Sequence, residues 1–202
     1  MPRVAGLAAA LALTAAAPAA AGESATCRGG DGPSDRTYAK NRFVHVYSKW
    51  DKSGDGDGKL VGCRRSDGAK RTLVALRFTG FRETTRVAGR VRLNRHMVGY
   101  EQIESYPQAD VAPTATRLAS WNSRTLNERF DAYHQRRTRN LVVTRTGGLA
   151  WVEVDPAGDA AVRAVDGAGV RTLDSGPVHD LGVELTIVSW FNGDEERFAR
   201  QR

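Results

Sequence analysis

The stretch "VGCRRSDGAKRTLVAL" (61–76) decides the fold, because "AVRAVDGAGVRTLDSG" (161–176) repeats its organisation later in the chain. The Asp-Gly pair begins at residue 67 in the first copy and at residue 166 in the second, 99 positions apart. Each copy has the pattern of a strand, a tight turn and a second strand. Glycine, and to a lesser degree aspartate, tolerates the positive φ of such turns. The sequence therefore predicts a repeated β-hairpin.

A second pattern recurs between these hairpins, in which short apolar strands end near an aromatic residue. The segments are "FVHVYSKW", "RLNRHMVGY", "VTRTGGLAW" and "GVELTIVSW", which end at Trp50, Tyr100, Trp151 and Trp190. The aromatic residues are 50, 51 and 39 positions apart. Together with the hairpins, they indicate units of four short antiparallel strands, which is typical of a propeller blade. We expect Trp151 and Trp190 to pack between sheets.

Helix signals are nearly absent after the first residues, because capping boxes do not precede apolar runs. One segment, 123–134, has Leu126, Phe130 and Tyr133 at helical spacing and allows a short helix. Its place in the repeat favours a strand. The sequence therefore predicts an all-β fold.

The segment "LAWVEVDPAGDAAVRAVDGAGVRTLDSGP" (149–177) resembles one blade of the β-propeller repeat proteins, loosely of the TolB or WD type. The resemblance covers roughly residues 40–200 and lacks the Trp-Asp signature and the Gly-His pair. It implies tandem four-stranded antiparallel blade-like units that form a small or partial β-propeller. We expect about three full units and a shortened last one, whereas closed propellers have four to eight blades. A minimal closed ring, an open arc and a half-ring completed by another copy all remain open.

The N-terminus has the pattern of a secretory signal peptide. Arg3 precedes an alanine-rich apolar run that is broken by Pro18 and ends in small residues before Gly22. We therefore expect a signal peptide at 1–21, a secreted or cell-surface protein, and no membrane span after cleavage. In an oxidising compartment the chain's two cysteines, Cys27 and Cys63, are expected to form a disulfide. It would tie the N-terminal segment 22–40 to a single β-repeat domain at 41–202.

The charge is strongly basic and carried by arginine. Removing Arg3 with the signal peptide leaves 29 of 30 basic residues against 23 acidic ones, and the chain has 25 arginines and 5 lysines. This composition fits an arginine face for phosphate or carboxylate groups, but a coding bias that fills exposed strand positions with arginine is the favoured explanation. The segment "HQRRTR" (134–139) supplies the candidate anionic contact, formed by Arg136, Arg137 and Arg139, and its alternative is a solvated loop. Trp121 is a candidate for stacking on a sugar.

One acidic loop, "DKSGDGDGK" (51–59), resembles the calcium loops of EF-hand, dockerin and integrin-type repeats. The oxygen-bearing residues alternate along it, as in loops that wrap around a hard cation; they are Asp51, Ser53, Asp55 and Asp57. Gly62 stands where an EF-hand has its bidentate glutamate, so any calcium site would be weak or completed from elsewhere. The alternative is a solvated hairpin loop. We therefore expect no cofactor, with calcium at this loop as the alternative.

No catalytic constellation is visible. A nucleophile, a base and stabilising donors are not seen together, and Ser175, His179 and Asp180 lack a nucleophile elbow. The acidic pairs Glu101/Glu104 and Glu195/Glu196 show no sign of convergence and are explained by solvation at loop edges. We therefore expect a secreted, non-enzymatic binding module for an anionic cell-envelope polymer, a glycan or another protein, and no nucleic-acid partner. The alternatives are a propeller-type glycan hydrolase or lyase, and a structural module that assembles with itself.

Overall fold

The computed structural model describes Cys27, Gly29, 35–51, 56–77, 85–105 and 114–202. The proposed signal peptide lies outside these residues. The described part is built from strands and contains no α-helix, which confirms the all-β prediction. It accordingly holds no helix that could cross a bilayer. The strands are β1 (Thr37–Lys40), β2 (Val44–Trp50), β3 (Asp57–Arg64), β4 (Lys70–Arg77), β5 (Thr85–Asn94), β6 (Met97–Ser105), β7 (Thr114–Asn122), β8 (Asn127–His134), β9 (Arg137–Val143), β10 (Leu149–Val154), β11 (Ala160–Asp166), β12 (Gly169–Ser175), β13 (Val178–Glu184), β14 (Ile187–Asn192) and β15 (Glu195–Arg200).

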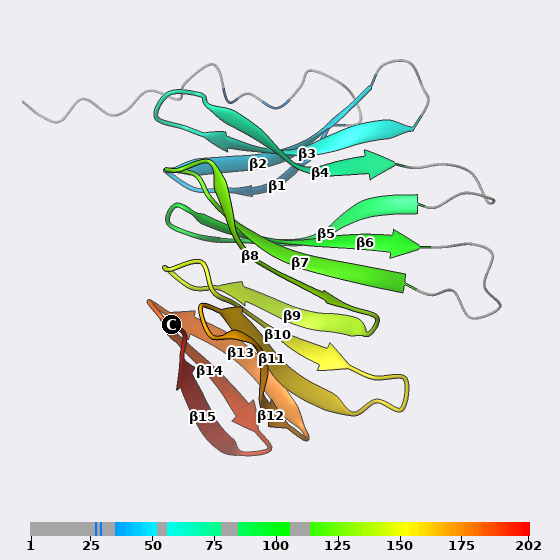
Figure 1. Ribbon diagram of the computed structural model, residues 1–202, viewed down its shortest axis with the longest axis vertical. Helices are drawn as coiled ribbons and strands as arrows, with labels where there is room; N and C mark the ends of the chain where they lie inside the picture. The colour runs from blue at the N-terminus through cyan, green and yellow to red at the C-terminus, as the bar shows by residue number, and fades with distance from the viewer. Residues whose placement is uncertain (1–26, 28, 30–34, 52–55, 78–84, 106–113) are drawn as a thin grey trace, which may run out of the picture.

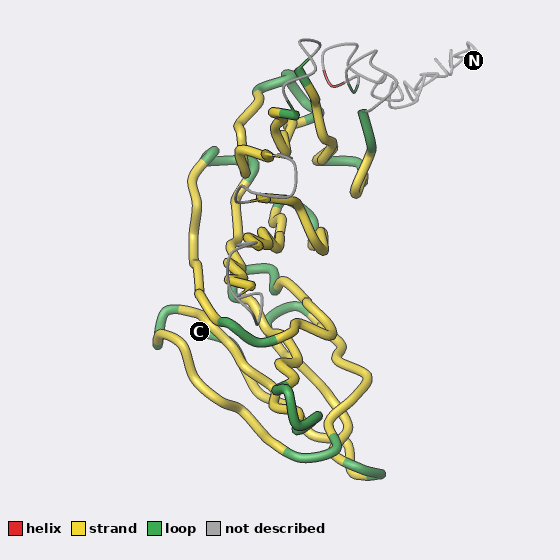
Figure 2. Tube along the Cα trace, turned by 90° about the vertical axis from the view of Figure 1, so that its right-hand side faces the viewer, coloured by secondary structure: helices red, strands yellow, loops and turns green. Residues whose placement is uncertain are grey.

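The strands form three antiparallel sheets in which sequence neighbours pair: β1–β8, β9–β12 and β13–β15. The eight-stranded sheet is joined at its middle by a single residue pair, Arg77 with Arg86, so it divides into two four-stranded halves. These halves and the two smaller sheets are the four strand groups of the molecule: β1–β4, β5–β8, β9–β12 and β13–β15. The last sheet has three strands, in keeping with the expected short final unit. The sheets are stacked along the molecule, with β1–β4 and β13–β15 at opposite ends (Figure 1). In the side view of Figure 2, the strands again follow one another from one end of the molecule to the other. The described strands therefore do not close into a ring.

Hydrophobic side chains fill the spaces between successive strand groups. A first cluster joins β2–β4 to β5–β7, with Leu60 and Trp121 at its centre. A second joins β6–β8 to β9–β11 around Leu141 and Trp151. A third joins β10–β11 to β13–β15 around Val152 and Trp190. Each strand group is thus covered by the next. The alternation of apolar residues along antiparallel strands gives each group an apolar face, which must be buried.

The four recurrent aromatic residues occupy matching places, because Trp50, Tyr100, Trp151 and Trp190 lie on β2, β6, β10 and β14, the second strand of each group. Trp151 and Trp190 are 1% and 3% exposed, so their expected role in the core is confirmed.

Both copies of the opening pattern form hairpins, β3–β4 and β11–β12. Gly68 has φ 76°, as its turn requires, but in the second copy the positive φ falls on Gly169 (φ 87°) instead of Gly167. The reason is that Asp166 pairs with Gly169, so the turn itself is Gly167–Ala168. The segment 127–134 is strand β8, which confirms the strand interpretation of this region.

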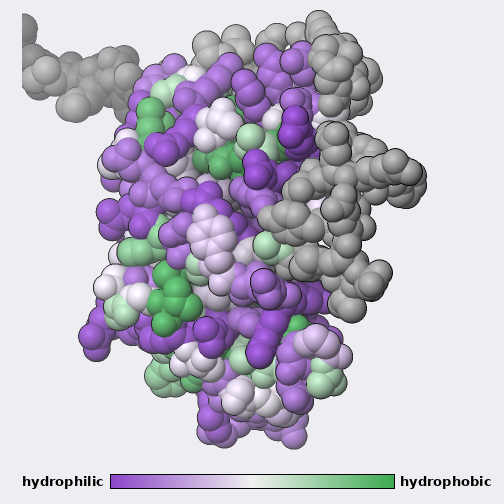
Figure 3. All heavy atoms as spheres, turned by 45° about the vertical axis from the view of Figure 1, so that its right-hand side comes forward, coloured by the Kyte–Doolittle hydropathy of each residue, from purple (hydrophilic) through white to green (hydrophobic). Residues whose placement is uncertain are grey.

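Hydrophilic side chains dominate the part of the surface that Figure 3 shows in colour, and hydrophobic residues form small separate clusters among them.

Candidate anion-binding site

The three arginines of the "HQRRTR" segment gather where β8 turns into β9. Arg136 lies in the two-residue connection, and Arg137 and Arg139 lie on β9; all three are exposed. β9 pairs with β10 on one side and is an edge strand on the other. The connection is short because β8 and β9 belong to different sheets that pack against each other. The packing of the second and third groups therefore sets the position of this basic corner, which is composed of Arg136, Arg137 and Arg139.

One buried carboxylate, Glu153 on β10, underlies the basic corner. Its Oε1 is 3.4 Å from Nε of Arg136, and its Oε2 is 3.6 Å from Nε of Arg163 on β11. The Glu153 side chain is 9% exposed, whereas that of Arg136 is 52% exposed. In the described part of the chain, Arg137 and Arg139 have no carboxylate partner. The corner therefore carries more positive charge than its own acid neutralises.

His134, the last residue of β8, lies behind the corner. Its ring stacks on Trp151 with centroids 5.8 Å apart, and its Nε2 is 3.3 Å from the Thr138 hydroxyl. Burial lowers the pKa of His134, although the Glu153 carboxylate opposes the shift. The imidazole is therefore neutral at neutral pH and adds packing instead of charge.

Glu101 corrects one sequence interpretation. It was expected to be a solvated partner of Glu104, but it is 1% exposed on β6. Its Oε2 accepts hydrogen bonds from the backbone N–H of Arg90 (2.9 Å) and from the Arg90 guanidinium (3.0 Å). The register of β5 and β6 is irregular between Ala88 and Val91, and this irregularity turns the Arg90 N–H toward the carboxylate. Glu101 is thus held in a structural ion pair, as Glu104 is with Arg86.

Trp121 does not belong to the surface. The expectation that it stacks on a sugar requires an exposed ring, but the side chain is 0% exposed and lies in the core between β3 and β7. A Cβ on Gly62 would stand 2.6 Å from its ring, so the two strands approach closely here. That part of the sequence-based site is wrong, because burial removes the ring from any ligand.

The candidate calcium loop connects β2 to β3. Asp51 donates its backbone N–H to the Asp57 carbonyl at 2.9 Å, and Gly56 has φ 71°. The Asp57 carboxylate is 3.4 Å from Nε of Arg77, which competes with a cation for that oxygen. Ser53 and Asp55 lie outside the described residues. Calcium binding therefore stays a prediction from the sequence.

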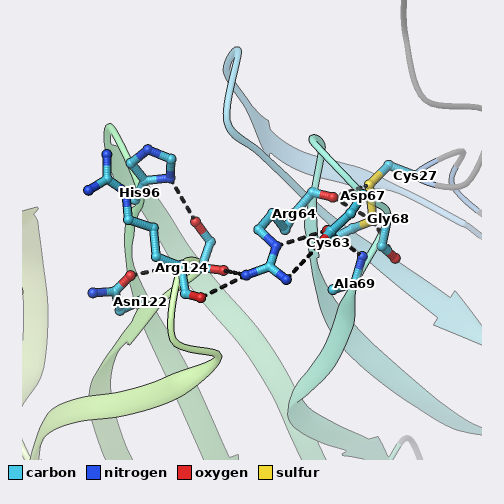
Figure 4. A network of polar contacts seen from close by, with 10 residues as sticks. Cys27, Cys63, Arg64, Asp67, Gly68, Ala69, His96, Asn122 and Arg124 are labelled. Atoms are coloured by element: carbon cyan, nitrogen blue, oxygen red, sulfur yellow. Dashed lines mark hydrogen bonds and ion pairs between the residues drawn. A yellow bond between two sulfur atoms is a disulfide. The ribbon is translucent and has the colours of Figure 1, made fainter.

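The expected disulfide between Cys27 and Cys63 is present, with Cα atoms 5.7 Å apart. Beside it, Arg64 forms a polar network that joins the first group to the β7–β8 turn (Figure 4). The guanidinium binds the Asp67 carboxylate through Nε and Nη2, and its Nη1 donates to the carbonyls of Ser123 and Arg124 at 3.2 and 2.7 Å.

Ser123 and His96 also meet in this network, with 3.2 Å between Oγ of Ser123 and Nδ1 of His96. Ser123 is 0% exposed. Burial, and then nearby arginines, lower the pKa of His96. No carboxylate among the described residues orients this histidine as a catalytic triad would require. The contact is therefore a structural hydrogen bond.

Comparison with known proteins adds little. No family model matches the chain, and no curated protein matches it. A chain in a crystal structure of the mitotic checkpoint complex is similar over 80% of this chain and 78% of that one, with 12% identity and a TM-score of 0.26. A TM-score this low carries no argument. What is established about the fold is that it is all-β, with antiparallel sheets in an open stack.

Proposed function

We propose that the protein is an exported, non-enzymatic module that binds an anionic polymer of the cell envelope through its basic corner. The observation that carries this proposal is the excess of guanidinium groups there. Arg136, Arg137 and Arg139 are exposed at one edge, and the carboxylate in contact with the group is that of Glu153. Arginine presents a planar fork of donors that fits carboxylate and phosphate groups, and several forks together suit a repeating anion.

For the architecture, we propose an open, partial β-propeller. The first strands of the four groups are neighbours in order: β1 lies against β5, β5 against β9, and β9 against β13. In a propeller, the first strands of successive blades line the centre in the same way. Arg137 and Arg139 are on one of these strands, so the basic corner would lie at the concave side of the arc.

The disulfide supports export, because disulfides persist in oxidising compartments. The ion pairs argue against the alternative of a glycan hydrolase. Glu101 and Glu153 are buried carboxylates on neighbouring groups, and each is matched by arginine, whereas a glycosidase needs two carboxyls that converge on one bond. These pairs are better explained as supports for the sheets.

Binding to dextran sulfate tests the proposal, with uncharged dextran as the negative control. The protein is the chain Gly22–Arg202, which contains every described residue. Fluorescence anisotropy of the labelled polymers is recorded at low and high salt. We expect binding to dextran sulfate alone, and weakening with salt, because exposed charges are screened within about 10 Å at 0.1 M salt.

The decisive variant changes Arg136, Arg137 and Arg139 to alanine. Exposed ion pairs contribute up to about 1 kcal/mol each, so the triple change should weaken binding by about tenfold or more. The matched control removes three other exposed arginines, Arg92, Arg124 and Arg145. Equal losses in the two triple variants would show that net charge, and not the corner, binds the polymer. Binding that persists in the Arg136/Arg137/Arg139 variant would refute the proposed site. Isolated cell-envelope material then tests the same pair of variants on the natural polymer.

A further inference from the structure

The C-terminal sheet, β13–β15, has one covered and one uncovered face. Val188 and Trp190 of β14 point into the core shared with β9–β12. Because side chains alternate along a strand, Ile187, Ser189 and Phe191 point the other way. No element of the described chain packs on this second face. Three of the five exposed large hydrophobic side chains of the described residues belong to this part of the chain: Leu185, Ile187 and Phe198.

The opposite end of the stack is different. On the outer side of the first group, Tyr47, Val61 and Cys63 are buried together with Cys27. Cys27, joined to Cys63 by the disulfide, thus covers part of the first sheet, whereas no described residue covers the last sheet in this way. Phe198 is 75% exposed midway along β15, an outer strand of the last sheet, and its burial would be favourable.

The uncovered face has a regular charge pattern. The strand register places Glu184, Ile187 and Arg200 in one row across the sheet, and His179, Phe191 and Glu196 in another. Gly182, Ser189 and Phe198 form the row between them. Glu184 and Arg200 thus lie on opposite outer strands, and Arg200 and Glu196 lie at opposite ends of the same strand.

The remaining ionisable residue of these rows is His179, and a neighbouring carboxylate balances its charge. Its Nδ1 is 2.9 Å from the Asp180 carboxylate, and its Nε2 is 3.0 Å from the Gly193 carbonyl. Both partners are acceptors, so the imidazolium form satisfies both contacts, and the hydrogen bond to Asp180 raises the pKa of His179. The charges that a neighbouring molecule would meet are therefore mainly those of Glu184, Glu196 and Arg200.

We propose that two copies of this chain associate through the uncovered face of β13–β15, which we call the C-terminal face, around a two-fold axis. An axis parallel to the strands lays β13 over β15 of the second copy. Glu184 then lies opposite Arg200, and Gly182 provides room opposite Phe198. An axis across the strands instead brings Arg200 opposite Glu196 and the two Phe198 rings together. Opposite charges meet in both arrangements, as an isologous contact requires.

The size of the face sets the strength of the contact. Three strands of six or seven residues span about 14 Å by 20 Å at ordinary sheet spacing. This is less than the roughly 800 Å² per partner of a stable interface. The dimer should therefore be weak and concentration-dependent.

Sedimentation velocity measures the association of Gly22–Arg202 from about 5 µM to about 500 µM, the range in which a weak interface is populated. We expect the weight-average sedimentation coefficient to rise with concentration, and Phe198→Glu to remove the rise. Tyr133→Glu is the matched control, because Tyr133 is 70% exposed on β8 and lies outside the C-terminal face. A chain that stays monomeric throughout, or a dimer that survives Phe198→Glu, would overturn the proposal.

Charge exchange distinguishes the two axes. Arg200→Glu should abolish the dimer in either case. Adding Glu184→Arg restores it if the axis runs along the strands, and adding Glu196→Arg restores it if the axis crosses them. Circular dichroism confirms that each variant keeps its sheets. If neither double variant recovers association, charge complementarity does not hold the copies together and the proposed interface is wrong.

Discussion

Asp67 and Asp166 lie 99 residues apart and share one turn contact. The Oδ1 of each accepts a hydrogen bond from the backbone N–H two residues later, Ala69 at 3.0 Å and Ala168 at 2.9 Å. Each carboxylate also accepts two hydrogen bonds from an arginine: Asp67 from Nε and Nη2 of Arg64, before the turn, and Asp166 from Nη1 and Nη2 of Arg171, after it. The turn hydrogen bond is therefore repeated, whereas the arginine that binds the carboxylate comes from the other strand of the hairpin.

These contacts predict a specific acid sensitivity. The hydrogen bond from Arg171 lowers the pKa of Asp166 to about 2. A carboxyl group whose pKa is lowered by folding stabilises the folded state above its unfolded pKa, near 4, and this contribution is lost as the pH falls towards 2. We expect Asp166→Asn to lower the free energy of unfolding at neutral pH by about 1–2 kcal/mol. The further loss of stability as the pH falls should then be smaller than in the wild type. Urea unfolding from neutral pH to pH 2 measures both effects.

The control for this prediction is Asp159→Asn, which removes an exposed carboxylate from the β10–β11 turn. Its stability should follow the wild-type curve against pH. If Asp166→Asn keeps the full acid-dependent loss, the Asp166–Arg171 pair is not its source.

Gly62 predicts a steric requirement between the first two groups. Its missing Cβ would stand 2.6 Å from the ring of the fully buried Trp121. Because the ring is rigid and enclosed, Gly62→Ala should destabilise the protein by about 1–3 kcal/mol. Urea unfolding followed by tryptophan fluorescence measures this cost. Gly167→Ala is the control, since its nearest neighbour would lie at an ordinary 3.7 Å, and its stability should change far less. Equal effects of the two substitutions would contradict the steric account.

Local turn chemistry explains why the strands were predictable. Asp-Gly pairs and the alternation of apolar residues act over a few positions, so they indicated the hairpins β3–β4 and β11–β12 directly. The recurrence of the aromatic residues placed Trp151 and Trp190 in the core. The expected export and the presence of two cysteines paired Cys27 with Cys63. The strand in 123–134 followed from the repeat and not from its own residues, whose helical spacing was misleading.

Long-range packing explains what the sequence missed. Trp121 is buried because Gly62, 59 positions earlier, lets β3 approach β7, and no local pattern around Trp121 shows this. Glu101 is buried because an irregular pairing in β5 turns the Arg90 N–H toward it. Glu153 escaped notice because its partners, Arg136 and Arg163, are contributed by different strands. Of the basic corner, the sequence showed only that its arginines are close together along the chain.

Asp174 accepts hydrogen bonds that join the last two sheets, and we expect the stability of the protein to depend on them. Its Oδ2 accepts from Nε1 of Trp190 at 2.8 Å and from Nδ2 of Asn192 at 3.0 Å. Asp174→Ala leaves the Trp190 N–H without an acceptor, which should cost about 1–3 kcal/mol. Asp174→Asn keeps an acceptor oxygen and should cost less. Urea unfolding compares the two variants, and an equal loss in both would show that charge, and not the acceptor, is what matters.

The Cys27–Cys63 disulfide predicts a large dependence of stability on redox state. It closes a loop across 36 positions, for which the loss of chain entropy in the unfolded state corresponds to about 3–4 kcal/mol. The native contacts at this end also depend on it, because the Cys27 carbonyl lies 2.6 Å from Nδ1 of the buried His45. Reduction should therefore lower the melting temperature clearly. The double variant Cys27→Ala/Cys63→Ala should have a melting temperature near that of the reduced protein, and reductant should not change it.

The rate of reduction should depend on folding. Since Cys63 is fully buried, reduction should be slow in the native state and fast in urea. A wild-type melting temperature that reductant leaves unchanged after unfolding and refolding would mean that the N-terminal segment is held by packing alone.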